Sequence, residues 1–334
     1  MGRRIAAIAL LTLVVAATGA MVLQVFQALS SLPILWLSDG IALVVMLVHG
    51  IWLWPGVLIG TLIALLASGF PLPEAFGFSG ISVFSVLLSH ALLCRYWRID
   101  TTLASMRDFL ALLWTAAIGG LAAALPGTFI QYLDGSLQNG LFSLHFIRWW
   151  QSASLGFLLM PLVLLVWRKM PKLAGLSPEK ILTCILCLCL ALFFGQVILG
   201  GWHIEPVASL TTISAHASDY WLFLFMIWAA IGCGRRVAML IMVIFAAQGF
   251  AGVFNGQGLF ANDLAHTGLM NYWFFVMLQG CIGFALATLL LENEQKRDDL
   301  SRSRQFSDDL LESLPGNFYL IDAQGRLKRW NTTL

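Results

Sequence analysis

Long apolar segments, separated by short stretches of turn-forming or charged residues, occupy most of the chain up to Leu291. A membrane-spanning helix needs about 20 apolar residues, and several segments approach that length. The pattern predicts about ten helices, some of them short enough to be tilted pairs or re-entrant segments. Their expected bounds are 5–23, 34–48, 54–68, 81–94, 109–130, 148–167, 181–199, 220–231, 237–254 and 273–291.

The composition changes abruptly after Leu291, where Glu292 begins a charged stretch without Gly or Pro. Such a stretch should continue the last helix as a stalk, and Pro315-Gly316 should end it. The apolar positions in the stalk are sparse, so its pairing with a second copy as a coiled coil and a single solvated helix both stay open. These positions are Leu300, Phe306, Leu310, Leu311 and Leu314.

The segment from Asn317 to Asn331 predicts a strand, an Asp-x-x-Gly turn and a second strand. An isolated hairpin is marginally stable in water, so we expect it to begin an α+β domain that continues past Leu334. The expected fold is therefore an all-α polytopic membrane protein with a helical stalk and the start of a second domain. The expected divisions are an integral membrane domain over 1–292, a helical linker over 293–314 and the new domain over 315–334.

Composition supports a membrane protein, since 59% of the residues are hydrophobic and 11% are charged. Soluble domains have about 25% charged residues. The net charge of +2 is too small and too scattered to indicate a nucleic-acid partner. The six cysteines lie in or beside apolar segments, where thiols pack as small hydrophobes. The sequence contains no phosphate-binding loop, nucleophile elbow or zinc-protease motif, so we predict no catalytic residue, metal or cofactor.

The distribution of Lys and Arg predicts the orientation, because cytoplasmic loops of membrane proteins carry an excess of basic residues. With the N-terminus inside, Arg3 and Arg4 and the loops near residues 95–107, 168–180 and 235–236 all lie on the inner side. Of the 19 basic residues only Arg148 falls outside. We therefore expect a multi-pass membrane protein with both termini in the cytoplasm.

Asp39 and Arg148 are the candidate charged residues of a ligand site. Asp39 is the only carboxylate inside a predicted span, about five residues or ~8 Å from the outer end of the second helix. A buried acid in a membrane is a functional candidate, although it also fits a cap on a helix break before Gly40 or a water-filled vestibule. Arg148 opens the sixth helix from the same face and is suited to pair with Asp39 or with an anionic ligand, or to reach lipid headgroups.

Aromatic and small polar residues are expected at a similar depth. They are Trp36, Trp149, Gln151, Ser152 and Ser154. Together with Asp39 and Arg148 they form the candidate ligand site. The alternative interpretation assigns the tryptophans to the interfacial belt and the polar side chains to helix packing.

Four segments resemble, in order and spacing, the type-one membrane-associated sensor family (MASE1). They are Trp36-Leu-Ser-Asp-Gly40, Trp54-Pro-Gly-Val-Leu-Ile-Gly60, the run from Trp149 to Pro161, and Trp228-Ala-Ala-Ile-Gly-Cys-Gly-Arg-Arg236. The resemblance covers about residues 5–292. One difference is that small Ala153 or Ser154 stands where the family often has an acidic residue. The terminal Leu314-Pro-Gly-Asn-Phe-Tyr-Leu-Ile-Asp322, with Gly325 and Asn331, resembles the start of a PAS domain.

The resemblance implies the sensory input module of a bacterial receptor, located in the bacterial inner membrane. In similar proteins the cytoplasmic output is a diguanylate cyclase or cyclic-di-GMP phosphodiesterase, with a histidine kinase of a two-component system as the alternative. The expected partners are membrane lipid, a second copy joined through the stalk, and a membrane-protein or small-molecule signal. A small-solute transporter is the alternative of a different class, but it would lead us to expect internal repeats and more intramembrane charges.

Overall fold

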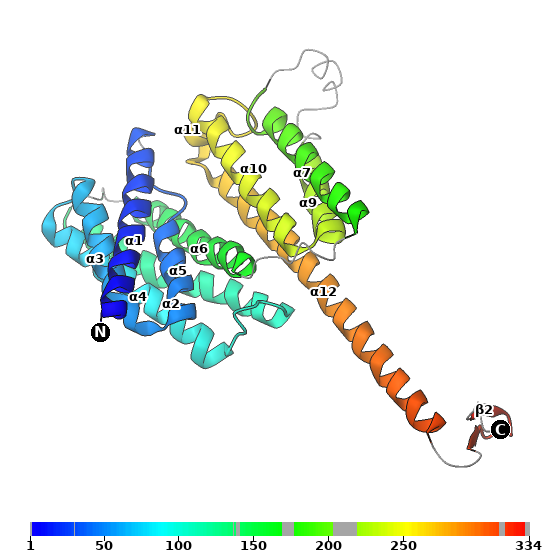
Figure 1. Ribbon diagram of the computed structural model, residues 1–334. Coiled ribbons are helices and arrows are strands. Elements are labelled where there is room, and N and C mark those ends of the chain that lie inside the picture. The colour runs from blue at the N-terminus through cyan, green and yellow to red at the C-terminus, as the bar shows by residue number, and fades with distance from the viewer. Residues whose placement is uncertain are drawn as a thin grey trace. The chain divides into compact units, whose positions relative to one another are not determined.

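The computed structural model describes residues 2–29, 31–135, 137, 141–168, 177–202, 219–313 and 318–330. These residues form two compact units, Met1–Thr288 and Leu289–Leu334. The first unit is helical, and α12 continues from it into the second (Figure 1). The second unit also contains a short hairpin.

Every helix predicted from the apolar pattern is present; most bounds differ by a few residues, but the helix expected over 81–94 begins nine residues earlier, at Leu72, and the one expected over 148–167 begins six residues earlier, at Phe142. The elements are α1 Gly2–Ala28, α2 Leu37–His49, η1 Ile51–Leu53, α3 Trp54–Ala67, α4 Leu72–Ala91, η2 Leu92–Trp97, α5 Met106–Leu133, α6 Phe142–Trp167, α7 Pro178–Ile198, α9 Asp219–Trp228, η3 Ala229–Cys233, α10 Arg235–Asn255, α11 Asp263–Thr267 and α12 Met270–Glu312. The described residues contain seven helices long and apolar enough to cross a membrane. The helices Leu37–His49, Ile51–Ala67 and Trp221–Cys233 are apolar but shorter.

The first six helices form one closely packed group. Helix α1 lies against α2 and α3, α2 crosses α6, and α5 lies between α4 and α6. Helices α7, α9 and α10 form a second group, and α10 also meets α6 (Figure 1). Helix α12 joins both groups, because Phe284 packs on Phe109 of α5 and the Tyr272 hydroxyl donates to the Ala246 carbonyl of α10.

The outward surface of this bundle is apolar. Trp114 and Phe129 of α5, Phe84 of α4 and Ile185 of α7 are all more than half exposed. In the most apolar window of α7 only 17% of the residues are buried. A helix surface of this kind requires lipid around it, as expected for a multi-pass membrane protein.

Basic side chains from distant elements converge on the connection between η2 and α5. Arg107 donates to the Trp97 carbonyl at 3.2 Å, and Arg168 at the end of α6 donates to the Thr101 hydroxyl at 3.5 Å. Arg235, the first residue of α10, donates to the Thr102 carbonyl at 3.3 Å and also to the Leu103 carbonyl. The basic loops of the sequence therefore lie at one end of the bundle, which we call the basic end.

Helix α12 runs without a break from Met270 to Glu312, so the helix predicted to continue past Leu291 is present. The residues expected to end it, Pro315 and Gly316, lie outside the described part of the chain. Further on, β1 (Tyr319–Ile321) and β2 (Leu327–Trp330) pair antiparallel, as the alternating pattern predicts.

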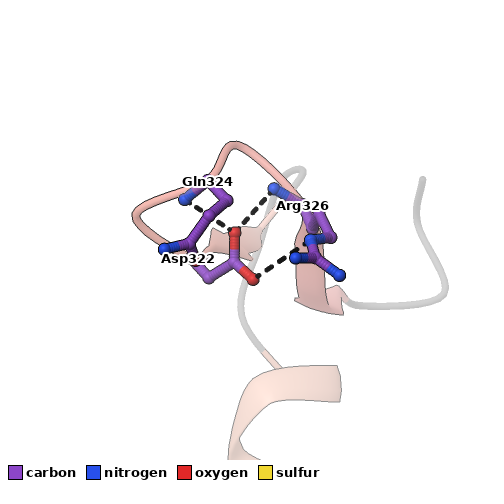
Figure 2. A network of polar contacts seen from close by, with 3 residues as sticks. All are labelled: Asp322, Gln324 and Arg326. Carbon is purple, nitrogen blue, oxygen red and sulfur yellow. Dashed lines mark hydrogen bonds and ion pairs between the residues drawn. The ribbon is translucent and has the colours of Figure 1, made fainter.

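The turn of the hairpin is organised by Asp322. Its Oδ1 accepts hydrogen bonds from the backbone N–H groups of Gln324 at 3.0 Å and Arg326 at 2.9 Å, and its Oδ2 lies 3.9 Å from Arg326 Nε (Figure 2). Gly325 supplies the positive φ of 78° that the turn requires. The predicted Asp-x-x-Gly turn is therefore confirmed.

Candidate functional site

A cavity of about 140 Å³ lies inside the first unit, among helices α1 to α6. Its lining combines a large apolar surface with a few polar groups. The lining residues are Leu23, Leu32, Pro33, Trp36, Asp39, Thr61, Leu65, Phe70, Phe78, Ile81, Ser82, Ala123, Gln131, His145, Trp149, Ser152 and Ala153. Several of them belong to the α1–α2 and α3–α4 connections and to the facing ends of α5 and α6. The cavity therefore lies toward the end of the bundle opposite the basic end.

Asp39 is the acid of this cavity, and it is only 3% exposed. The Ser82 hydroxyl of α4 donates a hydrogen bond to Asp39 Oδ1. The Thr61 and Ser82 hydroxyl oxygens are 3.4 Å apart, and because Ser82 already donates its proton to Asp39, Thr61 is the donor between them. Three helices thus supply one buried polar chain that ends at the carboxylate.

The structure corrects the expected surroundings of Asp39 in two respects. Helix α2 begins at Leu37, so Asp39 lies in its first turn rather than about five residues inside the helix. The helix continues through Gly40, and the Asp39 side chain caps no helix terminus, so the interpretation as a cap on a helix break is wrong. The N-terminal turn of a helix is electrostatically favourable for a carboxylate, which partly compensates for its burial.

Aromatic rings form much of the remaining wall. Trp149 of α6 packs edge-on against Phe78 of α4, with ring centroids 5.2 Å apart, and Phe78 packs on Phe70 at 6.1 Å. Gly127 of α5 makes room for Trp149, because a Cβ at that position would lie 2.5 Å from the indole ring. Trp36 completes the aromatic part of the lining.

Helices α2 and α6 approach unusually closely beside the cavity. A Cβ on Gly40 would lie 2.0 Å from the Gly156 carbonyl oxygen, and a Cβ on Gly156 would lie 2.0 Å from that of Trp36. The Trp36 backbone N–H donates to the Ser152 carbonyl at 3.1 Å. Small residues at helix crossings allow such approaches in membrane proteins. Two of the segments that carry the family resemblance therefore meet here.

Gln151 links the cavity side of α6 to α12. Its carbonyl accepts a hydrogen bond from the Trp273 indole N–H at 2.8 Å, and Trp273 also packs on Trp150 with centroids 6.0 Å apart. Gln151 itself is 4% exposed and does not line the cavity. Ser152, the next residue, does line it and is bonded to Trp36.

Arg148 lies apart from Asp39. No ion pair joins these two residues, both of which belong to the described chain, so the suggested pairing is not observed. The Arg148 guanidinium packs instead on Gly268, where a Cβ would lie 2.2 Å from Nη2. Ser154 is also outside the lining, and its hydroxyl donates to the Gln151 carbonyl within α6 at 3.1 Å.

The cavity thus brings together four of the seven candidate residues, namely Trp36, Asp39, Trp149 and Ser152. Sequence reasoning missed Thr61, Ser82 and His145. A signal for Ser82 was present, since α4 carries buried serines at positions 79, 82, 85 and 89, a spacing that places them on related faces of one helix. Several hydroxyl groups on one face of an otherwise apolar helix indicate that this face contacts a polar group on a neighbouring helix.

Comparison with known proteins gives one family. A family model described as MASE1 matches residues 5–294, which confirms the resemblance carried by the four sequence segments. No curated protein and no solved structure matches the chain.

Proposed function

Since this chain belongs to the MASE1 family of membrane-associated sensory input domains, we propose that the cavity beside Asp39 is its sensory site. A binding site of this class combines an apolar enclosure with a few convergent polar groups, and the cavity has both. A ligand there would contact α2 at Asp39, α4 at Phe78 and α6 at Trp149. Occupancy would therefore bias the packing of three helices at once.

The observation that carries the proposal is a pair of hydrogen bonds to neighbouring carbonyls of α6 that connect the cavity to α12. Trp36 bonds to the Ser152 carbonyl, and the neighbouring Gln151 carbonyl bonds to Trp273 of α12. A shift of α6 against α2 would thus move the anchor of α12. This connection can transmit a signal only if the helices have two arrangements and the ligand favours one of them. The existence of these two arrangements is what the experiments below test.

Helix α12 is the proposed route to the output. It continues to Glu312, and Leu300, Phe306 and Leu310 on it are 77%, 65% and 51% exposed. Exposed apolar residues on a helix favour pairing, so we take the receptor as a homodimer joined by this segment. The basic end would face the cytoplasm of a bacterial cell, and the cavity end the periplasm.

We take the hairpin as the beginning of a PAS domain. Tyr319, Ile321, Leu327 and Trp330 are each about half exposed, between 49% and 58%. A two-stranded hairpin with apolar side chains exposed in this way needs further structure to cover it. The proposed output beyond it is cyclic-di-GMP synthesis or hydrolysis, with a histidine kinase as the alternative.

Filling the cavity tests the sensory role without knowledge of the ligand. Ala123→Leu on α5 would place a side chain into the cavity, whereas Ala122→Leu adds the same atoms one position away, outside the lining. In the full-length receptor we expect Ala123→Leu to change the basal output at least twofold and Ala122→Leu to leave it unchanged. Equal output from all three proteins, at matched membrane levels, would contradict the proposal.

A further inference from the structure

The charges around the cavity limit the ligands that it accepts. Asp39 is the only acid among the lining residues, and the lining contains no Lys or Arg. A buried carboxylate that forms no ion pair loses hydration and gains little in return. The Ser82 hydroxyl and the Trp36 indole N–H both donate to the carboxylate and compensate for part of this loss, but neither brings a positive charge. The cavity therefore favours either a cationic ligand or a proton on Asp39.

A metal ion does not fit this cavity. The described residues contain no group of three His, Cys, Asp or Glu side chains able to hold one. Hard cations need six or more oxygen ligands, and soft ones need several thiolate or imidazole groups. Apart from Asp39, the lining offers only hydroxyls, Gln131 and His145 as side chains with atoms that can coordinate a metal. The cation that suits it is organic.

The aromatic walls favour an ammonium group in particular. Trp36, Trp149 and Phe78 all line the cavity, and aromatic faces attract cations, most strongly on Trp. Desolvation strengthens this attraction, and groups of aromatic side chains are a common means of recognising quaternary ammonium ions. The same walls would exclude an anion.

The volume of the cavity and its polar groups further limit the class of ligand. A cavity of about 140 Å³ is close to the ~150 Å³ apolar cavity that accommodates benzene, so about six to eight non-hydrogen atoms fit. His145 Nδ1 is buried and has no hydrogen-bond partner among the described residues. A ligand with a hydroxyl or a similar group could satisfy it.

We propose that the cavity binds a small organic ammonium ion with a polar substituent, in which the charged group lies between Asp39 and the rings of Trp36 and Trp149. This inference rests on the proposed sensory role of the same cavity. The ion could be a free solute or the amine headgroup of a lipid, since the chemistry of recognition is shared.

Calorimetry on the purified full chain in phosphatidylglycerol nanodiscs tests the charge requirement. The probes are choline, ethanolamine and 3,3-dimethylbutan-1-ol, which has the shape of choline but no charge. We expect the two ammonium probes to bind and the neutral alcohol to bind at least tenfold more weakly, a factor that corresponds to about 1.4 kcal/mol. Asp39→Asn should weaken choline binding at least tenfold, and Asp108→Asn, a buried acid outside the cavity, should not.

Trp149→Leu provides a second variant that keeps the carboxylate and removes one aromatic face. It should weaken choline more than the neutral alcohol. Nanodiscs that also contain phosphatidylethanolamine distinguish a lipid headgroup from a free solute as the natural ligand. If the headgroup occupies the cavity, it should compete with the probes and abolish their binding. Unchanged probe binding indicates that the ligand is a free solute. Both results support the ammonium class.

Three results would overturn the inference: equal binding of choline and its neutral isostere, unchanged choline binding in Asp39→Asn, or no ammonium binding at all. If ammonium binding fails while Ala123→Leu still changes the output, the ligand class is wrong and the sensory role stands. If the ammonium probes bind but Ala123→Leu leaves the output unchanged, the cavity binds the ion without acting as the sensor.

Discussion

At the residue level, the crossing of α2 and α6 depends on two glycines that allow main chain to approach main chain. Because a Cβ on Gly156 would lie 2.0 Å from the Trp36 carbonyl oxygen, Gly156→Ala must push the helices apart. We expect a loss of about 1–3 kcal/mol of stability, as for other overpacked sites, and a lower thermal midpoint in detergent. Gly80→Ala on α4 is the control, since nothing lies within 4 Å of its added Cβ. Equal midpoints for the two variants would show that the crossing is looser than described.

Gly268 supports a second prediction at this level. It has a φ of +65°, and its added Cβ would lie 2.2 Å from Arg148 Nη2. Gly268→Ala should therefore destabilise the protein by about 1 kcal/mol more than Gly256→Ala, which has a similar φ of +66° but open space around it. Thermal unfolding in detergent measures the difference.

The additional destabilisation caused by Gly268→Ala, relative to Gly256→Ala, should vanish when Arg148 is also replaced by Ala. The two substitutions affect the same contact, so their effects on stability are not additive. If the additional destabilisation persists in that background, Arg148 does not pack on Gly268 as described.

The sequence could identify some site residues but not their partners. Asp39 was recognisable because an acid is rare in an apolar segment. Its partner Ser82 lies 43 residues away, and nothing local indicates that the two helices meet. For the same reason Arg148 was expected beside Asp39, since a shared depth in the membrane predicts neither the direction in which a side chain points nor the neighbouring helix. The packing on Gly268 depends on the path of the chain before α12.

At the level of elements, insertions into α12 test whether this helix transmits the signal from the membrane domain to the output. One residue inserted between Asp299 and Leu300 rotates everything beyond it by about 100°, whereas seven residues restore the phase to within about 20°. If α12 transmits a rotation or pairs through a fixed face, the single insertion should change the output of the full-length receptor severalfold. The seven-residue insertion should return it toward the wild-type value.

The measurement is the output of membrane vesicles that contain equal amounts of each receptor. A smooth decline with insertion length, with no recovery at seven residues, would show that the helix acts as a spacer rather than through its rotational phase.

Element boundaries were predictable where composition changes sharply and less so elsewhere. The start of α7 was expected at residue 181, three residues late, although the sequence carries a signal for it: the Ser177 hydroxyl accepts from the Lys180 N–H, and Pro178 stands at the first helical position. The π-helical turns η2 and η3 could not be predicted, because their hydrogen bonds depend on how the helix ends pack. The five residues of α11 carry no apolar period at all.

At the scale of the whole molecule, the two ends of the first unit differ in charge, which predicts its orientation in the membrane. Leu72 begins α4 at the cavity end and is 62% exposed, whereas Asp100 is exposed at the basic end. In a protein without native cysteines, Leu72→Cys should react with a membrane-impermeant maleimide added to spheroplasts. Asp100→Cys should react only after the membrane is opened. The reverse pattern would place the cavity in the cytoplasm.

The central claim is that the cavity acts on α12 through α6, and a double-mutant cycle tests it most directly. Trp273→Phe removes the indole N–H that bonds the Gln151 carbonyl but keeps an aromatic ring, and Trp114→Phe on the lipid-facing side of α5 is its control. Output is measured for the full-length receptor with and without Ala123→Leu in each background. We predict that filling the cavity changes the output in the wild-type and Trp114→Phe proteins and has no effect in Trp273→Phe. A change of the same size in all three backgrounds would contradict the account.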